Sequence, residues 1–134
     1  MLVIVVGVNM VSTNNVTTVI NGITVPSEPP SAQNNATLVG FDLNGNGVKD
    51  DVERLIALKW LSNFADGVMV ARNAQLLLTQ QGSTIDPSLQ RAAFCALSLN
   101  KVEESVIMSA ILNTEDRFKS YARNVGLAKI YRRD

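Results

Sequence analysis

The pattern of apolar and polar residues changes along the chain at about residue 50. From Asp50 onward, apolar residues recur at spacings of three and four, which is the period of an α-helix. Before that point, short runs of Val, Ile and Thr are separated by Asn, Gly and Pro, which is typical of short strands and turns. We therefore expect a mainly α protein of four or five packed helices, preceded by a short β-hairpin and an extended segment.

The strongest local signal in the first part is Asn21-Gly22, which lies between two β-branched runs. Both residues tolerate positive φ, so this pair favours a two-residue hairpin turn. The pattern predicts strands at 16–20 and 23–26. Three prolines then end any strand pairing and favour an extended connector: Pro26, Pro29 and Pro30.

The N-terminal residues 1–8 read MLVIVVGV. This run is too short to cross a bilayer, which takes about 20 apolar residues, so we expect no membrane span. Two interpretations stay open. The run has the length of a signal-peptide apolar region, although no Lys or Arg precedes it. It could equally form a buried β-strand, because Val and Ile suit a pleated surface.

Two helices are predicted directly after residue 49. The first runs from Asp50 or Asp51 to about residue 65, and its apolar side chains cover most of its circumference, which indicates a heavily buried helix. The second spans roughly residues 68–81 and ends at Gly82, a suitable C-cap.

Two further helices have clear starts. Asp86 is a good N-cap and Pro87 fits the first helical position; this helix ends near Leu99 or continues past Asn100 to Leu112. The last helix begins after Thr114. The apolar residues expected on one face of it are Phe118, Tyr121, Ala122 and Val125.

Composition excludes several classes of function. The 134 residues contain 12 Lys+Arg and 12 Asp+Glu, and this zero net charge argues against a nucleic-acid partner. The absence of His excludes Ser-His-Asp and Cys-His catalysis and His-ligated zinc. The single Cys95 lies among apolar residues, which predicts a buried, inert thiol. The adjacent acidic pairs do not face one another on a helix, so we expect no catalytic dyad.

Charge also divides the chain into two parts. Residues 1–41 contain one charged side chain, Glu28, and the other charged residues follow Phe41. We expect a single domain in which an extended and hairpin segment, residues 1–41, leads into a loop and helical body, residues 42–134. The basic side chains of residues 115–134, Arg117 among them, are predicted to form a solvated helix face.

One motif carries chemistry. Residues 42–53 read DLNGNGVKDDVE, which fits the calcium-loop pattern D-x-[DN]-x-[DN]-G-x5-E. Calcium takes six to eight oxygen ligands, and a short loop supplies them only if alternate residues point inward and the chain turns sharply. Gly47 permits that turn. The predicted ligands are the side chains of Asp42, Asn44, Asn46, Asp50 and Glu53 and the backbone carbonyl of Val48.

This loop resembles EF-hand calcium loops, and more closely the one-sided kind in dockerin and thrombospondin type 3 modules. Two features separate it from a paired EF-hand. The lead NNATLVGF does not read as a helix, and Lys49 stands at loop position eight, where paired loops carry an apolar residue. The segment from PSEPP through DDVER also resembles stretches of exported bacterial proteins without an assigned activity.

The motif predicts a calcium-binding, calcium-stabilised exported protein of structural or interaction type, periplasmic or secreted from a bacterium, with no catalysis. Two neutral Asn ligands and a nearby lysine predict weak affinity, with a Kd on the order of 10⁻⁵–10⁻³ M. Two alternatives stay open: an intracellular calcium-responsive regulator, and a fragment of a larger enzyme. The sequence identifies no protein partner.

Overall fold

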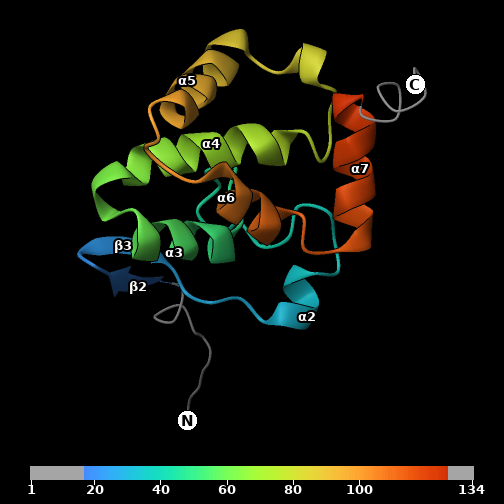
Figure 1. Ribbon diagram of the computed structural model, residues 1–134. Coiled ribbons are helices and arrows are strands. Elements are labelled where there is room, and N and C mark those ends of the chain that lie inside the picture. The colour runs from blue at the N-terminus through green and yellow to red at the C-terminus, as the bar shows by residue number, and fades with distance from the viewer. Residues whose placement is uncertain (1–16, 127–134) are drawn as a thin grey trace.

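The computed structural model describes residues 17–126 (Figure 1), so the predicted strand or signal region at residues 1–8 lies outside the described residues. The described part is mainly helical with one short antiparallel hairpin, which confirms the predicted fold class. Its elements are β2 Thr17–Ile20, β3 Ile23–Pro26, α2 Ser31–Asn34, α3 Asp50–Lys59, α4 Phe64–Leu76, α5 Pro87–Ser98, α6 Glu104–Ile111 and α7 Glu115–Val125, with 3-10 turns at Leu61–Asn63 and Gly82–Thr84. No helix among these residues is long and apolar enough to cross a membrane.

The hairpin forms where the sequence predicts it. Strands β2 and β3 pair from Thr17 opposite Pro26 to Ile20 opposite Ile23. Asn21 and Gly22 adopt φ of 52° and 84°, the positive values that this turn requires. The Asn21 Nδ2 group also donates to the carbonyl oxygen of Ala57 at 3.2 Å, so the turn is fixed to α3.

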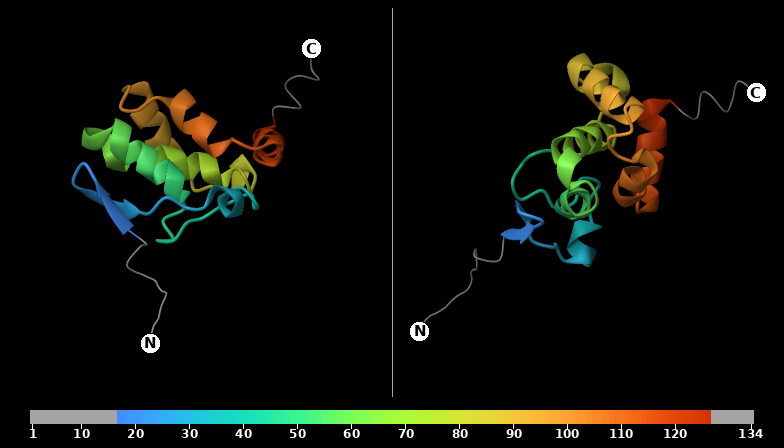
Figure 2. Two further views of the ribbon diagram at one scale, coloured as in Figure 1. Left: turned by 90° about the horizontal axis from the view of Figure 1, so that it is seen from below. Right: turned by 60° about the vertical axis from the view of Figure 1, so that its left-hand side comes forward.

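Helix α4 lies at the centre of the helical body, with α5 on one side and α3 and α6 on the other (Figures 1 and 2). The hairpin lies against α3, and α7 runs across the end of the body, roughly perpendicular to α4. Gly67 allows α3 and α4 to approach closely, because a Cβ at this position would lie 2.5 Å from Ile56 Cγ2. The core consists of aliphatic side chains from all four helices and their connections: Val48, Val52, Ile56, Val70, Ala71, Ala74, Leu78, Ala93, Ala96, Val102, Ile107 and Ile111.

The first helix is shorter than predicted. The sequence favours a helix to about residue 65, but α3 ends at Lys59, because Trp60 adopts φ −134° and ψ 60°, and α4 begins at Phe64. This break lets α4 fold back along α3. The prediction that apolar side chains are buried around most of this helix fails at Leu58 and Leu61, which are 61% and 49% exposed.

Among the other helices, the predicted start of α5 is confirmed and the predicted end of α4 is wrong. The Asp86 side chain accepts the Ser88 N–H at 2.9 Å and so caps α5 as predicted. Helix α4 ends at Leu76 instead of residue 81, and Gly82 begins a 3-10 turn. Continuation of α5 to Leu112 is excluded, because Asn100 has φ of 58° and α6 starts separately at Glu104.

Helix α7 begins as predicted but buries a different face. The predicted start after Thr114 is confirmed, and Thr114 Oγ1 caps the helix by accepting the Arg117 N–H at 3.2 Å. However, Arg117 and Ser120 are buried while Phe118 is 55% exposed, so the predicted apolar face is wrong at Phe118 and the predicted solvated face is wrong at Arg117. Arg117 is buried through polar rather than apolar contacts, because oxygen acceptors surround its guanidinium. Cys95 is exposed rather than buried, since it lies on the outer side of α5.

Candidate metal centre

The loop of residues 42–53 closes on itself just before and within the first turn of α3. The Asp50 N–H donates to the carbonyl oxygen of Phe41 at 2.8 Å, which brings the two ends of the loop together. Gly45 and Gly47 have φ of 67° and 87°, a region that side chains disfavour, so the tight turn depends on glycine at both positions.

Asp42 organises the first half of the loop. Its Oδ1 accepts the Asn46 N–H at 3.2 Å and its Oδ2 accepts the Gly47 N–H at 2.8 Å. The Asn46 Oδ1 atom accepts the Val48 N–H at 3.0 Å in turn. These bonds fold the predicted ligand residues at loop positions one, five and seven around one another.

Glu53 joins the second half of the loop to the first. Its carboxylate is only 3% exposed, and it accepts hydrogen bonds from Asn46 Nδ2 at 2.8 Å and from Asn44 Nδ2 at 3.2 Å. Three of the predicted ligand residues are therefore in direct contact. The donors are neutral amides, so the charge of Glu53 has no cationic partner among the described residues.

Asp50 is fully buried beside this group. Its Oδ1 accepts the Leu43 N–H at 3.1 Å. Burial raises the pKa of Asp50 from 3.8 to about 6, and the neighbouring carboxylates of Asp42, Glu53 and Asp51 act in the same direction, whereas the Leu43 hydrogen bond lowers it. The high pKa is therefore mainly an effect of burial, to which the neighbouring carboxylates add.

Val48 and Lys49, at loop positions seven and eight, face the protein interior. The Val48 side chain lies in the core, and the role of its carbonyl as a ligand stays a prediction. Lys49 is also buried, and its Nζ lies 3.2 Å from the Ala110 carbonyl oxygen, 3.4 Å from Asn113 Oδ1 and 3.9 Å from Asp51. Burial lowers the pKa of Lys49 to about 8. Its ammonium group thus binds to the α6–α7 connection instead of the predicted ligand side chains.

Two arginines that the sequence does not single out as site residues support the loop. Arg72 on α4 donates through Nε to the Asn46 carbonyl oxygen at 2.8 Å, and a Cβ on Gly47 would lie 3.2 Å from its Cγ atom. Arg117 on α7 binds the segment before the loop through the carbonyl oxygens of Thr37 and Leu38, each at 2.9 Å. Arg72 is an isolated basic residue in the sequence and Arg117 belongs to a basic helix, so only their tertiary positions give them these roles.

The described residues 17–126 contain no group of three or more His, Cys, Asp or Glu side chains placed to hold a metal ion. The carboxylates of Asp42, Asp50 and Glu53 each accept hydrogen bonds within the loop, and two Asn side chains lie between them. The donors available here are carboxylate and amide oxygens, which suit a hard cation such as calcium rather than a softer transition metal.

Comparisons of the chain with models of protein families, with characterised proteins and with solved structures give no match. The function of the loop must therefore be argued from its own residues.

Proposed function

We propose that the loop of residues 42–53 binds a calcium ion that stabilises an exported protein of structural or interaction type without catalytic activity. One observation carries the proposal: Asp50 and Glu53 are buried in the loop that Asp42 organises, and no Lys or Arg is paired with any of these three carboxylates in residues 17–126. Burying unpaired charge is costly, so a bound cation is the partner that this group lacks.

The donor set suits calcium. Asp42, Asp50 and Glu53 would supply charged oxygens, Asn44 and Asn46 amide oxygens, and Val48 its backbone carbonyl. The two amides currently present Nδ2 to Glu53, but each also carries an oxygen, so the same side chains can serve a cation once the amide groups turn. Magnesium is less suitable, because it demands a smaller octahedral site and gives up its waters reluctantly.

Calcium at this position would join three parts of the protein. Asp42 ends the segment that leads from the hairpin, Asn46 is bound by Arg72 of α4, and Glu53 belongs to the first turn of α3. Because the unfolded chain holds calcium poorly, the ion favours the folded state by about 2.7 kcal/mol at a concentration of 100 times the Kd. A weak site of this kind acts as a structural element rather than as a sensor.

The expected Kd, on the order of 10⁻⁵–10⁻³ M, is typical of extracellular modules, which work in calcium-rich surroundings. We therefore place the protein outside the bacterial cytoplasm, and the apolar run at residues 1–8 is consistent with export. The resemblance of the loop to dockerin and thrombospondin type 3 loops favours the same location.

The proposal is tested by thermal unfolding in EDTA and in about 5 mM calcium, for the unaltered protein and for Glu53→Gln. Glutamine keeps the size of the side chain and an oxygen that the two Asn amides can reach, but it removes the charge. We expect calcium to raise the Tm of the unaltered protein and to leave that of Glu53→Gln unchanged. In EDTA the variant should be at least as stable as the unaltered protein, because carboxylate repulsion is relieved.

Glu103→Gln is the matched control, since Glu103 is an exposed carboxylate outside the loop. It should keep the full calcium response. If Glu53→Gln keeps the response as well, or if calcium leaves the Tm of the unaltered protein unchanged, the loop is not a calcium site.

A further inference from the structure

Three buried side chains from different elements meet at the base of the candidate calcium loop. A Cβ placed on Gly40 would lie 2.6 Å from Asn34 Oδ1, 2.9 Å from Lys49 Cδ and 3.0 Å from Arg117 Nη2. These side chains come from α2, the loop and α7, and all three are buried. Gly40 also has φ of 67°, which disfavours any residue with a side chain. Glycine is therefore needed where these groups converge.

Asn34 joins the two ends of the loop through its side chain. Its Oδ1 accepts the Phe41 N–H at 2.9 Å, directly before the first predicted ligand. Its Nδ2 donates to Asp51 Oδ2 at 3.1 Å, in the first turn of α3, which also carries the predicted ligand Glu53. One buried amide thus links the entrance of the loop to its exit, although Asn34 lies outside the motif of residues 42–53.

Arg117 of α7 holds Asn34 in this position. Its Nη2 donates to the carbonyl oxygens of Asn34 and Thr37, and its Nε donates to that of Leu38. These carbonyl groups belong to the short segment between α2 and Gly40, so the guanidinium fixes the backbone from which Asn34 reaches the loop. Helix α7 is therefore connected to the loop through two residues in series, Arg117 and Asn34.

A second connection runs through Asn113, between α6 and α7. Its Oδ1 accepts from Arg117 Nη1 at 2.6 Å and from Lys49 Nζ at 3.4 Å, and Lys49 is position eight of the loop. The Asn113 Nδ2 group donates to Asn35 Oδ1 at 3.2 Å. The start of α7 is thus bonded both to the loop itself and to the segment that precedes it.

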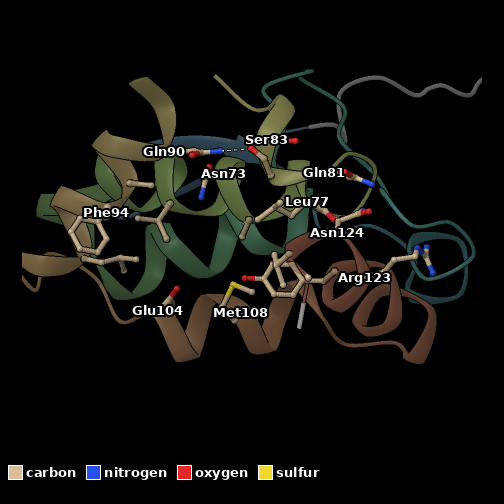
Figure 3. A pocket seen from close by; sticks show the side chains of 18 residues that line it. Asn73, Leu77, Gln81, Ser83, Gln90, Phe94, Glu104, Met108, Arg123 and Asn124 are labelled. Atoms are coloured by element: carbon tan, nitrogen blue, oxygen red, sulfur yellow. Dashed lines mark hydrogen bonds between the residues drawn. The ribbon is translucent and has the colours of Figure 1, made fainter. Parts of the chain in front are cut away.

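Helix α7 also forms one wall of a cavity of about 600 Å³ whose other walls are α4, α5 and α6 (Figure 3). Arg123 and Asn124 of α7 lie at the opposite end of this cavity from Phe94. The Asn124 Nδ2 group donates to the Leu77 carbonyl oxygen of the α4 end at 2.7 Å. The docking of α7 therefore decides how far this cavity is enclosed.

We infer that Asn34 couples calcium binding in the loop to the docking of α7. This inference rests on the proposed calcium site. A loop whose ends are already held together loses less conformational freedom when the ion binds, so its affinity is higher. No helix leads into this loop, because α2 ends at Asn34, and the Asn34 amide supplies the restraint instead. Since coupling between two sites is reciprocal, bound calcium strengthens the docking of α7 by the factor by which docking strengthens calcium binding.

The first test is a calcium titration of ¹⁵N-labelled protein to about 20 mM, with the Kd taken from NMR shifts of the Gly45 and Gly47 amides. Asn34→Leu keeps the size of the side chain and removes both of its hydrogen bonds to the ends of the loop. Arg117→Lys removes the fork of donors but keeps the charge, so long-range attraction to the ion is unaltered. We expect Asn34→Leu to weaken calcium binding about five- to tenfold and Arg117→Lys about three- to fivefold.

Two matched variants separate this effect from a general loss of stability. Asn63→Leu removes the hydrogen bond from another half-buried asparagine to the Lys101 carbonyl oxygen, and Arg123→Lys changes an exposed arginine on α7. Both should keep the Kd within about twofold of the unaltered protein. The same spectra show whether each variant is folded. If Asn34→Leu is not, the comparison of Arg117→Lys with Arg123→Lys decides.

The second test follows the docking of α7 through exchange of the Arg117 Nε–H with water, because this group is bonded to the Leu38 carbonyl oxygen. Saturating calcium should slow this exchange about fivefold relative to EDTA. The side-chain amide of Gln90, which is bonded to the Gly82 carbonyl oxygen outside the network, should exchange at the same rate in both conditions.

Three results would overturn the coupling while leaving the calcium site intact. They are an unchanged Kd in both Asn34→Leu and Arg117→Lys, an equal loss of affinity in Asn63→Leu and Asn34→Leu, and no effect of calcium on Arg117 exchange. If the unaltered protein shows no calcium-dependent shifts in the loop, the proposed function fails and the coupling fails with it.

Discussion

Arg117 is the side chain whose replacement tests the description of the fold most directly. It is fully buried, and its guanidinium donates five hydrogen bonds to a segment about 80 residues earlier and to the α6–α7 connection. The acceptors are the carbonyl oxygens of Asn34, Thr37 and Leu38 and the side-chain oxygens of Asn35 and Asn113. Arg117→Met keeps most of the side-chain length and removes every donor.

The expected loss follows from the three carbonyl groups. Each buried carbonyl left without a donor costs about 1–3 kcal/mol. Asn35 and Thr37 are exposed, so water can reach part of this segment. We therefore take the lower end of this range for each of the three carbonyl groups. Replacing the guanidinium also removes the cost of burying its charge, which offsets part of this loss of stability. The free energy of unfolding should therefore fall by about 2–3 kcal/mol, a large share of the 5–15 kcal/mol typical of a domain.

The measurement is equilibrium unfolding in urea, in EDTA so that no ion contributes. Arg123→Met is the matched control, because Arg123 is an exposed arginine on the same helix, bound only to Ser120 Oγ within the described residues, and should cost less than about 0.5 kcal/mol. Arg117→Lys should lose more than half as much as Arg117→Met, because an ammonium group cannot reproduce the planar fork of donors. A loss below about 1 kcal/mol for Arg117→Met would refute the reasoning.

Three further predictions concern single positions. Gly67→Ala should destabilise the protein by about 1–2 kcal/mol in urea unfolding because its Cβ would meet Ile56, whereas Gly82→Ala should not, because its Cβ would meet only Leu77 Cδ2 at an ordinary contact distance of 3.6 Å. For Asp50, folding raises the pKa from 3.8 to about 6, so its stabilising contribution in EDTA is complete below pH ~4 and lost as the pH rises through ~6. Asp50→Asn should flatten this pH profile and gain about 1 kcal/mol at pH 7, after allowance for screening. Cys95 should react with a thiol reagent in the native protein at a rate close to that in urea.

The parts of the fold that the sequence predicts correctly depend on neighbouring residues. Asn21-Gly22 sets the hairpin turn by backbone preference alone, and Asp86 and Thr114 cap their helices through N–H groups two or three positions away. The periodicity of the apolar residues is likewise a local property, so the helical class follows from it.

The errors occur where distant residues decide the outcome. The helical spacing of apolar residues continues from Leu55 through Trp60 to Phe64, yet α3 ends before Trp60 and α4 packs back against it. Arg117 is read from the sequence as a solvated residue, and only the carbonyl groups of residues 34–38 explain its burial. The burial of Arg117 leaves no sign within one helical turn of that residue, whereas the Ser62-Asn63 pair after Trp60 is a local signal for a new helix start.

For the loop, the sequence motif names residues that do lie together, since Asn44, Asn46 and Glu53 are in direct contact. It could not name Arg72, which reaches the loop from another helix, or show that Lys49 points away from the predicted ligands. Calcium binding itself stays a prediction that the melting experiment addresses.

The position of Arg117 also sets an order of events during synthesis. The segment that leads into the loop, residues 34–38, leaves the ribosome about 80 residues before the arginine that fixes it. Contacts of such long sequence separation form late and slow folding. The hairpin and α3 can therefore form while the loop entrance is still unrestrained. The entrance to the loop is fixed only when α7 has been made and has docked.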